Sequence, residues 1–319
     1  MTDSSIRIRP AETDADLTTL ARIVNTVTPD EPTSLTEIRW QQATYPGGRW
    51  FLGDLDGETV GAASVGRIFI YPPEYDALWA SVHVLSDHRR HGVGSALLAA
   101  VSEVARERGK EHLEAAVMEH RTDALAFLEH RGFTEAERSK MVRLPLADLT
   151  LPDLPLADGL DLVTLADRPD LLPSIHAVAL ETFPDIPSSD EPMRAGDFDE
   201  FRARDIDRVG APHDACFIAV DRATGEAVGY ANLLMAPGRT DLAWHDMTAV
   251  RRAWRGKGIA TALKVATIRW AIDHGLTALD TGNDVANGPM RTVNARLGYQ
   301  PLPDEVVLRG PLVPGRVPA

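Results

Sequence analysis

A turn rich in glycine and cationic side chains is the part of the sequence best suited to chemistry. Arg255 and Lys257 alternate with Gly256 and Gly258, and apolar residues at the spacing of one helix face follow over 259–270. Such a turn points free backbone N–H groups and the positive end of a helix at one place, which suits a phosphate or pyrophosphate. The glycines allow a close approach, because they have no Cβ atom.

The turn occurs twice in the chain. A shift of 166 residues relates Arg89 to Arg255, and it also relates the apolar helix face that starts at Val93 to the one that starts at Ile259. The same shift relates residues further along: Val84 to Val250, Gly109 to Gly275, Gly132 to Gly298, and Phe133 to Tyr299. A period this long is that of a whole domain and not of a solenoid repeat.

The repeat predicts two domains, at residues 1–144 and 160–319. The linker between them, 145–159, contains three prolines and is expected to be extended and packed only in part. Each domain should contain a strand, helices, a hairpin, the strand before the turn, the helix after it, another strand, a short helix and a last strand. Asp14 or Asp16 is expected to cap the first helix.

Composition narrows the classes of partner. The chain has 319 residues, of which 44% are hydrophobic and 25% charged, and a net charge of −14. These fractions are those of a soluble globular protein, and the negative charge argues against nucleic acid or an anionic membrane as a partner. There is no apolar run of ~20 residues and no signal peptide pattern, so a cytoplasmic location is expected.

Two kinds of side chain are expected to be structural. Cys216 is the one cysteine, so an intramolecular disulfide is excluded. Because it lies in an apolar run, its thiol is expected to be buried. His83, His88 and His91 lie close in sequence, but nothing indicates the geometry that zinc needs, so no metal site is predicted.

Two motifs together indicate a family. Arg89-x-x-Gly92-x-Gly94 and Arg255-x-x-Gly258-x-Ala260 resemble the Q/R-x-x-G-x-G/A motif of the GCN5-related N-acetyltransferases. The segments 127–133 and 293–299 resemble that superfamily's second signature, a short helix that ends in glycine and an aromatic residue. The resemblance implies an α/β (α+β) fold of two tandem domains, each with a mixed, mainly antiparallel sheet flanked by helices.

The resemblance also implies acetyl-CoA as cosubstrate and direct transfer of the acetyl group to an amine. The strand before the turn would splay from its neighbour to admit the cosubstrate, and the N–H near Val250 would stabilise the oxyanion. The residues that would bind acetyl-CoA are Val250, Arg255, Gly256, Lys257, Gly258, Ile259, Ala260 and Asn287, with Val84, Arg89, Arg90, Gly92 and Gly94 in the first copy.

The copies differ near the expected thioester. By the shift of 166, Asp246 corresponds to Ala80 and His245 to Trp79, so we predict that the second copy is catalytic and the first degenerate. Asp246 or His245 would accept the proton of the amine, or the two would form a structural ion pair.

Asparagines replace the usual acid of the family. Asn294 stands where many members have a tyrosine as general acid, and Leu128 stands there in the first copy. Asn294 and Asn287 would bind the cosubstrate or simply hydrogen-bond the backbone as helix caps.

The expected acceptor is a small-molecule primary amine. Because a carboxylate near a cation makes a good anchor, Asp246 and the acidic loop 181–200 would attract a cationic acceptor, or the loop would simply be solvated. The alternative function is a non-catalytic acyl-CoA-binding or regulatory protein. A monomer or a homodimer is expected in either case.

Overall fold

The computed structural model describes residues 5–152, 154, 156–188 and 191–314. The chain forms two compact units. Unit 1 contains the residues up to 137 and those from 306 onward, and unit 2 contains residues 138–305. No helix within the described residues is both long enough and apolar enough to cross a bilayer.

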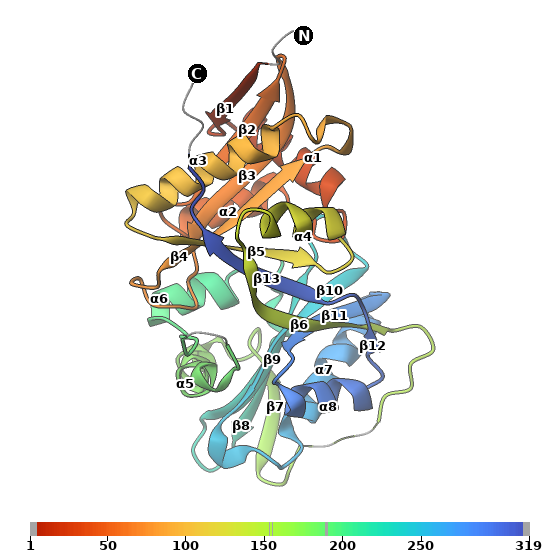
Figure 1. The fold of residues 1–319 in the computed structure, drawn as a ribbon. Helices are drawn as coiled ribbons and strands as arrows, with labels where there is room; N and C mark the ends of the chain where they lie inside the picture. The colour runs from red at the N-terminus through yellow and green to blue at the C-terminus, as the bar shows by residue number, and fades with distance from the viewer. Residues whose placement is uncertain (1–4, 153, 155, 189–190, 315–319) are drawn as a thin grey trace. The chain divides into compact units, whose positions relative to one another are not determined.

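Unit 1 has a mixed sheet in the order β1-β2-β3-β4-β5-β13 (Figure 1). The strands are β1 (Ile6–Pro10), β2 (Arg49–Leu55), β3 (Glu58–Arg67), β4 (Ala77–Val84), β5 (His112–Met118) and β13 (Glu305–Pro311). The first four are antiparallel to their neighbours, whereas β4 and β5 are parallel. The predicted hairpin is confirmed as β2 and β3, and its turn lies at Asp56 and Gly57.

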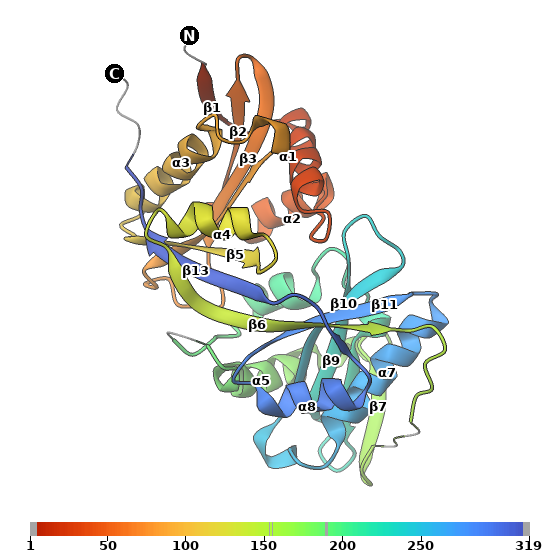
Figure 2. The same ribbon diagram turned by 45° about the vertical axis from the view of Figure 1, so that its right-hand side comes forward.

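Helices cover both faces of this sheet. They are α1 (Asp14–Val27), α2 (Leu35–Thr44), α3 (Val93–Glu107) and α4 (Thr122–Glu129). One core lies under α1 and α2 and another under α3, and Figure 2 shows α1 and α3 on opposite sides of the sheet. The cap of α1 is Thr13, because its hydroxyl accepts from Asp16 N while the Asp16 carboxylate accepts from Thr13; the expectation that an aspartate caps this helix was wrong.

Unit 2 repeats this plan in the order β7-β8-β9-β10-β11-β6, with β12 paired to β6. The strands are β7 (Leu160–Thr164), β8 (Phe217–Asp221), β9 (Ala227–Met235), β10 (Leu242–Val250), β11 (Ala278–Asp284), β6 (Thr134–Pro145) and β12 (Gln300–Pro301). The helices are α5 (Leu172–Thr182), α6 (Phe198–Phe201), α7 (Ile259–Asp273) and α8 (Gly288–Arg296), and a π-helical turn (Arg202–Ile206) follows α6.

The last strands of the two sequence copies are exchanged between the units. From residue 138 onward β6 belongs to unit 2 and pairs with β11, whereas β13 belongs to unit 1 beside β5 (Figure 1). Arg143 of β6 lies opposite Asp280 and donates to both of its carboxylate oxygens, at 2.7 and 2.6 Å. Arg309 of β13 lies 3.7 Å from Glu114 in unit 1. The boundaries predicted at 144 and 160 follow the sequence repeat, whereas the compact units divide at 137 and 305.

The segment predicted as a linker packs in part. Leu146 is buried in the core of unit 2, and Leu149, Leu151 and Leu156 lie half-buried against that unit's cores. Asp153 and Pro155 lie outside the described residues.

The strand exchange makes a crosswise prediction. Leu308 of β13 lies in the core of unit 1, so Leu308→Ala should cost about 2–5 kcal/mol and speed hydrogen exchange in β1 to β5, although this residue belongs to the second sequence copy. Leu144→Ala on β6 is the matched variant and should instead speed exchange in β8 to β11. If Leu308→Ala instead speeds hydrogen exchange in β8 to β11 and leaves β1 to β5 unchanged, β13 does not belong to unit 1.

Candidate active site

Two neighbouring strands part in the middle of each sheet. In unit 2, β10 and β11 pair only over Leu242–Trp244 and Ala278–Asp280. In unit 1, β4 and β5 pair only over Ala77–Trp79 and His112–Glu114. The splay that the family resemblance implies is therefore confirmed in both units.

Backbone groups of β10 point into the gap that this parting leaves. Arg251 N donates to Val228 O at 2.9 Å, so residues alternating with Arg251 turn their N–H and C=O groups away from β9. These are Thr248 and Val250, beyond the end of the ladder with β11. The first open carbonyl, that of His245, accepts from the Thr281 hydroxyl at 3.0 Å.

The two predicted turns have matching backbone geometry. Gly92 and Gly258 precede α3 and α7 with φ of 90° and 78°, and neither helix has a side-chain cap. Among the described residues, no hydrogen bond uses the backbone N–H groups of 256–260. Gly256 also has a positive φ of 77°, and its counterpart Arg90 has φ of 67°. An arginine in this conformation costs roughly 1–2 kcal/mol more than glycine would.

The motif arginines hold the turns in place. Arg255 Nε donates to Val250 O at 3.0 Å, and Arg89 Nε donates to Val84 O at 3.1 Å. Arg89 also forms an ion pair with Asp123. The Lys257 ammonium lies 4.3 Å from the centre of the Trp254 ring. Arg255 and Arg89 thus bind each turn to the last residue of the strand before it.

The acidic loop faces the turn of unit 2. Asp185, at the end of a short helical turn (Phe183–Asp185), accepts from Arg255 at 2.7 Å and from two nitrogens of Arg252. The Arg252 guanidinium, and next Arg255, hold the pKa of Asp185 below its usual range. Glu181 accepts from Arg252 N at 2.7 Å. Asp185 therefore neutralises Arg252 and Arg255, and Glu181 binds a backbone N–H, so both acids have partners within the protein. That the loop attracts a cationic acceptor stays a prediction; residues 189–190 lie outside the described chain.

Unit 2 has a β-bulge at the gap, and unit 1 does not. The ladder between β9 and β10 shifts between His245 and Met247, whereas the ladder between β3 and β4 runs without a shift. Asp246 is thus an extra residue, and by register Ala80 corresponds to His245. The pairings of Ala80 with Asp246 and of Trp79 with His245, expected from the sequence shift, were wrong.

His245 is part of the core. It is 3% exposed, its Nδ1 lies 2.9 Å from the Tyr299 hydroxyl, and its Nε2 lies 3.0 Å from the Thr267 hydroxyl. Burial, and then the nearby Lys264, hold the pKa of His245 well below its usual value. A buried, neutral imidazole with both nitrogens engaged argues against the predicted role as a base.

Asp246 lies exposed at the edge of the gap. Its Oδ2 accepts from Asn232 Nδ2 at 3.1 Å, and Asn232 Oδ1 accepts from Met247 N at 3.2 Å, so one buried amide fixes both the bulge and the carboxylate. Because of the bulge, Asp246 and Val250 do not share a face of β10, contrary to the alternation expected for a regular strand.

The two asparagines differ in their contacts. Asn287 caps α8, since its side chain accepts from Met290 N at 3.3 Å. Asn294 is 2% exposed and donates to Asn283 Oδ1 at 2.6 Å. Its own Oδ1 has no hydrogen-bond donor in the described part of the chain. A buried acceptor without a donor fits a ligand that brings an N–H group.

Polar side chains line the gap of unit 2 where unit 1 has apolar ones. In unit 1 these positions belong to the core: Val82, Leu98, Ala115, Val117, Leu128 and Phe133. In unit 2 they are Thr248, Lys264, Thr281, Asn283, Asn294 and Tyr299. The side chains around the parted strands are therefore apolar in unit 1 and polar in unit 2.

Lys264 is the member of this set whose importance the sequence did not reveal. It is 2% exposed, and its ammonium lies 5.3 Å from the centre of the Tyr299 ring. Within the described residues its ammonium has no ion-pair partner and no hydrogen-bond acceptor. Burial lowers the pKa of Lys264 to about 7. The only sequence signal was its place on the helix face otherwise occupied by apolar residues.

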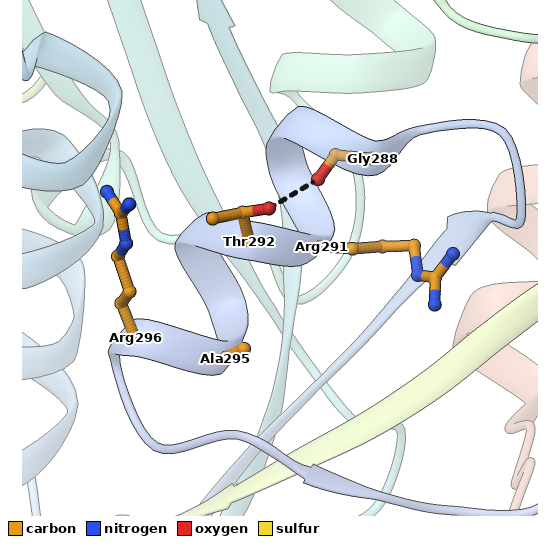
Figure 3. A pocket seen from close by; sticks show the side chains of 5 residues that line it. All are labelled: Gly288, Arg291, Thr292, Ala295 and Arg296. Carbon is orange, nitrogen blue, oxygen red and sulfur yellow. Dashed lines mark hydrogen bonds between the residues drawn. The ribbon is translucent and has the colours of Figure 1, made fainter.

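A shallow open pocket lies elsewhere, on the exposed side of α8 (Figure 3). Its lining residues are Gly288, Arg291, Thr292, Ala295 and Arg296. The Thr292 hydroxyl donates to Gly288 O at 2.9 Å, and the side chains of Arg291 and Arg296 extend in different directions from the helix. None of the side chains that line the gap contributes to this pocket.

Cys216 is buried as predicted, and burial raises the pKa of its thiol to about 12. Within the described ranges, no three His, Cys, Asp or Glu side chains are arranged to hold a metal ion.

The sequence profile of the acetyltransferase (GNAT) family matches residues 17–133 and 173–299, which is more than half of the chain. The chain belongs to this family. The protein is therefore an acyltransferase with tandem GNAT domains, and the family uses acetyl-CoA. No curated protein sequence gives a significant match.

Solved structures of similar fold include two that span nearly the whole chain. A GCN5-related N-acetyltransferase from Sphaerobacter thermophilus has 19% identity and a TM-score of 0.71, covering 99% of this chain and 98% of its own. A tandem GNAT protein from the clavulanic acid biosynthesis pathway has 22% identity and a TM-score of 0.75, covering 97% and 99%. At these identities the likeness concerns the fold.

The buried ammonium predicts an unusual stability profile. The native state releases the Lys264 proton near pH 7, whereas the unfolded chain keeps it to about pH 10.4, so between these values a higher pH stabilises the native state. Lys264→Leu, which restores the residue of unit 1, should raise the free energy of unfolding by on the order of 2 kcal/mol at pH 6–7. The gain should shrink toward pH 9.

The matched control for this measurement is Lys257→Leu, because Lys257 is an exposed lysine on the turn before the same helix. It should change the free energy of unfolding by less than about 0.5 kcal/mol at either pH. A destabilised Lys264→Leu at pH 6 in chemical denaturation would show that the ammonium has a stabilising partner after all.

Proposed function

We propose that the protein transfers the acetyl group of acetyl-CoA to the primary amine of a small molecule, and that unit 2 performs the reaction. The observation that carries this proposal is the gap between β10 and β11, with a bulge at its edge and a polar lining. An amine held beside a thioester reacts without a covalent enzyme intermediate, so most of the rate comes from positioning.

The residues around the gap fit acetyl-CoA. The N–H groups of 256–260 are free to hold its pyrophosphate, and Gly258 leaves open space where a Cβ atom would stand. The arm of the cosubstrate carries amide groups, and the buried Asn294 oxygen offers an acceptor for one of their N–H groups. The N–H groups of Thr248 and Val250 would stabilise negative charge on the thioester oxygen.

Asp246 is the exposed carboxylate next to this gap. A free alkylamine holds its proton up to about pH 10, as lysine does, so the acceptor must lose a proton before it attacks. Asp246 would accept this proton or hold the ammonium, and the two roles leave different kinetic traces: loss of a base lowers kcat, whereas loss of an anchor raises KM.

Unit 1 keeps the turn but not the rest of this arrangement. The side chains around its parted strands are apolar, the ladder of β4 with β3 has no bulge, and Asp246 has no counterpart there. A non-catalytic role, as in the alternative of an acyl-CoA-binding protein, therefore suits unit 1 alone.

One prediction of the proposed function concerns the anion site of unit 2. Gly258→Asp places a negative charge where the pyrophosphate is proposed to lie and should weaken acetyl-CoA binding at least tenfold, measured by calorimetry in a Gly92→Asp background. Because Gly258 has φ of 78°, the matched control is Gly258→Asn, which has the same shape, tolerates this conformation and adds no charge. Equal affinity for the Asp and Asn variants would contradict the site.

Another prediction of the proposed function concerns the asymmetry of the units. Gly92→Asp alone should leave most of the thiol release from acetyl-CoA and an amine intact, whereas Gly258→Asp should abolish it. Circular dichroism should show that both variants are folded. An inactive Gly92→Asp beside an active Gly258→Asp would mean that unit 1 is the catalyst.

A further inference from the structure

A hydroxyl without a partner marks a second polar site, on the side of unit 2 where α5 and α6 pack. Tyr230 of β9 is 1% exposed, and no residue in the described chain hydrogen-bonds its hydroxyl. Leaving a buried hydroxyl unsatisfied costs about 1–3 kcal/mol, so a native protein seldom retains one without a use.

Two carboxylates stand on elements that pack around this hydroxyl. Tyr230 shares one core cluster with Phe201 and Ile206, which flank Asp205, and Asn232, two residues along β9, holds the Asp246 carboxylate. Burial raises the pKa of Tyr230 well above its usual value, and the negative charges of Asp205 and Asp246 raise it further. Asp246 stands on the bulge of β10, and Asp205 lies in the π-helical turn after α6. Bulges and π-helical turns are both frequent at functional sites, where they redirect side chains. Three elements therefore bring these groups together.

Asp205 is partly accessible to solvent. Its side chain is one-quarter exposed, although protein atoms surround it. Arg204 donates from Nε and Nη2 to the same oxygen, Oδ2, at 2.9 and 2.7 Å. The other oxygen, Oδ1, has no hydrogen bond from any described residue, so it can accept one from a ligand.

We propose that Asp205, Asp246 and the Tyr230 hydroxyl form the site for the acceptor amine, in which Asp246 anchors the ammonium and Asp205 removes its proton. This inference rests on the proposed function and names the place and the second carboxylate of the acceptor site. Unit 1 lacks the site, because Ala62 occupies the position of Tyr230 by register and Asp246 has no counterpart.

The transfer of the acetyl group needs only the amine, the thioester and Asp205. The ammonium gives one proton to Asp205, and the neutral nitrogen attacks the carbonyl carbon of the thioester. A C–N bond forms, the C–S bond breaks, and the thiol group leaves with the second proton of the nitrogen. The products are an amide, a thiol and the proton on Asp205, which returns to the solvent.

The two carboxylates are suited to different roles. Burial, and in smaller part the charge of Asp246, raise the pKa of Asp205 to about 6, close to the value that suits a base at neutral pH. The other ionisable groups around Asp205 are Arg204 and Glu200 on the same helical segment, Arg208 after it, and Tyr230. Among the charged groups that act on Asp205, Asp246 is the one that raises its pKa and the two arginines lower it.

Tyr230→Phe is the sharpest test, because it removes only the oxygen. A hydroxyl that serves nothing would leave the kinetics unchanged when lost, and stability would stay equal or rise. A hydroxyl in the acceptor site would also leave stability equal or higher, but kcat/KM for the amine should fall about tenfold. Thermal melting and thiol release from acetyl-CoA, with n-butylamine and a panel of other primary amines, separate the two cases.

The carboxylates are tested beside this variant. Asp205→Asn should lower kcat by about a hundredfold or more and remove the fall in kcat/KM below about pH 6. Asp246→Asn should mainly raise KM. Asp207→Asn is the matched control, because it removes the same charge two residues along from an exposed carboxylate that pairs with Arg202, and it should change neither parameter.

Binding of n-butylammonium to the full chain loaded with acetyl-CoA, followed by NMR, separates this inference from the proposed function. Binding that is lost in Tyr230→Phe and Asp246→Asn supports the site even if no amine is acetylated. Acetylation with unchanged kinetics in all three variants would leave the proposed function intact and overturn the site. A wild type that does not bind n-butylammonium would also overturn it.

Discussion

The parting of β10 from β11 after three paired residues is the constraint on which the rest of unit 2 depends. A sheet that ends a ladder in its interior exposes backbone groups that would otherwise be paired, and these must be satisfied by side chains, water or a ligand. Thr281 satisfies the His245 carbonyl, and Arg255 satisfies that of Val250. The N–H groups between them remain directed into the gap, next to the free N–H groups at the start of α7.

The bulge at Asp246 gives this gap its chemistry. It turns His245 toward α7 and into the core, while Asp246 faces the side of α5 and α6. Asn232 holds both the carboxylate and the backbone of the bulge, so the position of Asp246 is built into the strand. Unit 1 has the same turn and the same splay without the bulge, and the side chains around its parted strands are apolar. The comparison of the two units thus separates the features that both share from those that only unit 2 has.

The sequence predicted much of this arrangement and missed three parts of it for physical reasons. The repeat, the turns and the order of elements followed from glycine positions and apolar spacing. The bulge did not, because the connection before β10 is shorter than that before β4 and compensates in length, so the shift of 166 looks unbroken. The strand exchange was also hidden, since β6 and β13 carry equivalent patterns, including Arg143 and Arg309, and either could complete either sheet. Tyr230 and Asp205 lie in segments whose burial only the folded chain reveals.

A crystal structure of the protein with acetyl-CoA tests the central claim most directly. We predict that the pyrophosphate lies against the N–H groups of 256–260 and that the thioester lies between β10 and β11, near Thr248 and Val250. The gap of unit 1 should retain its apolar side chains in their present places. Acetyl-CoA bound between β4 and β5, with the gap of unit 2 empty, would contradict the account.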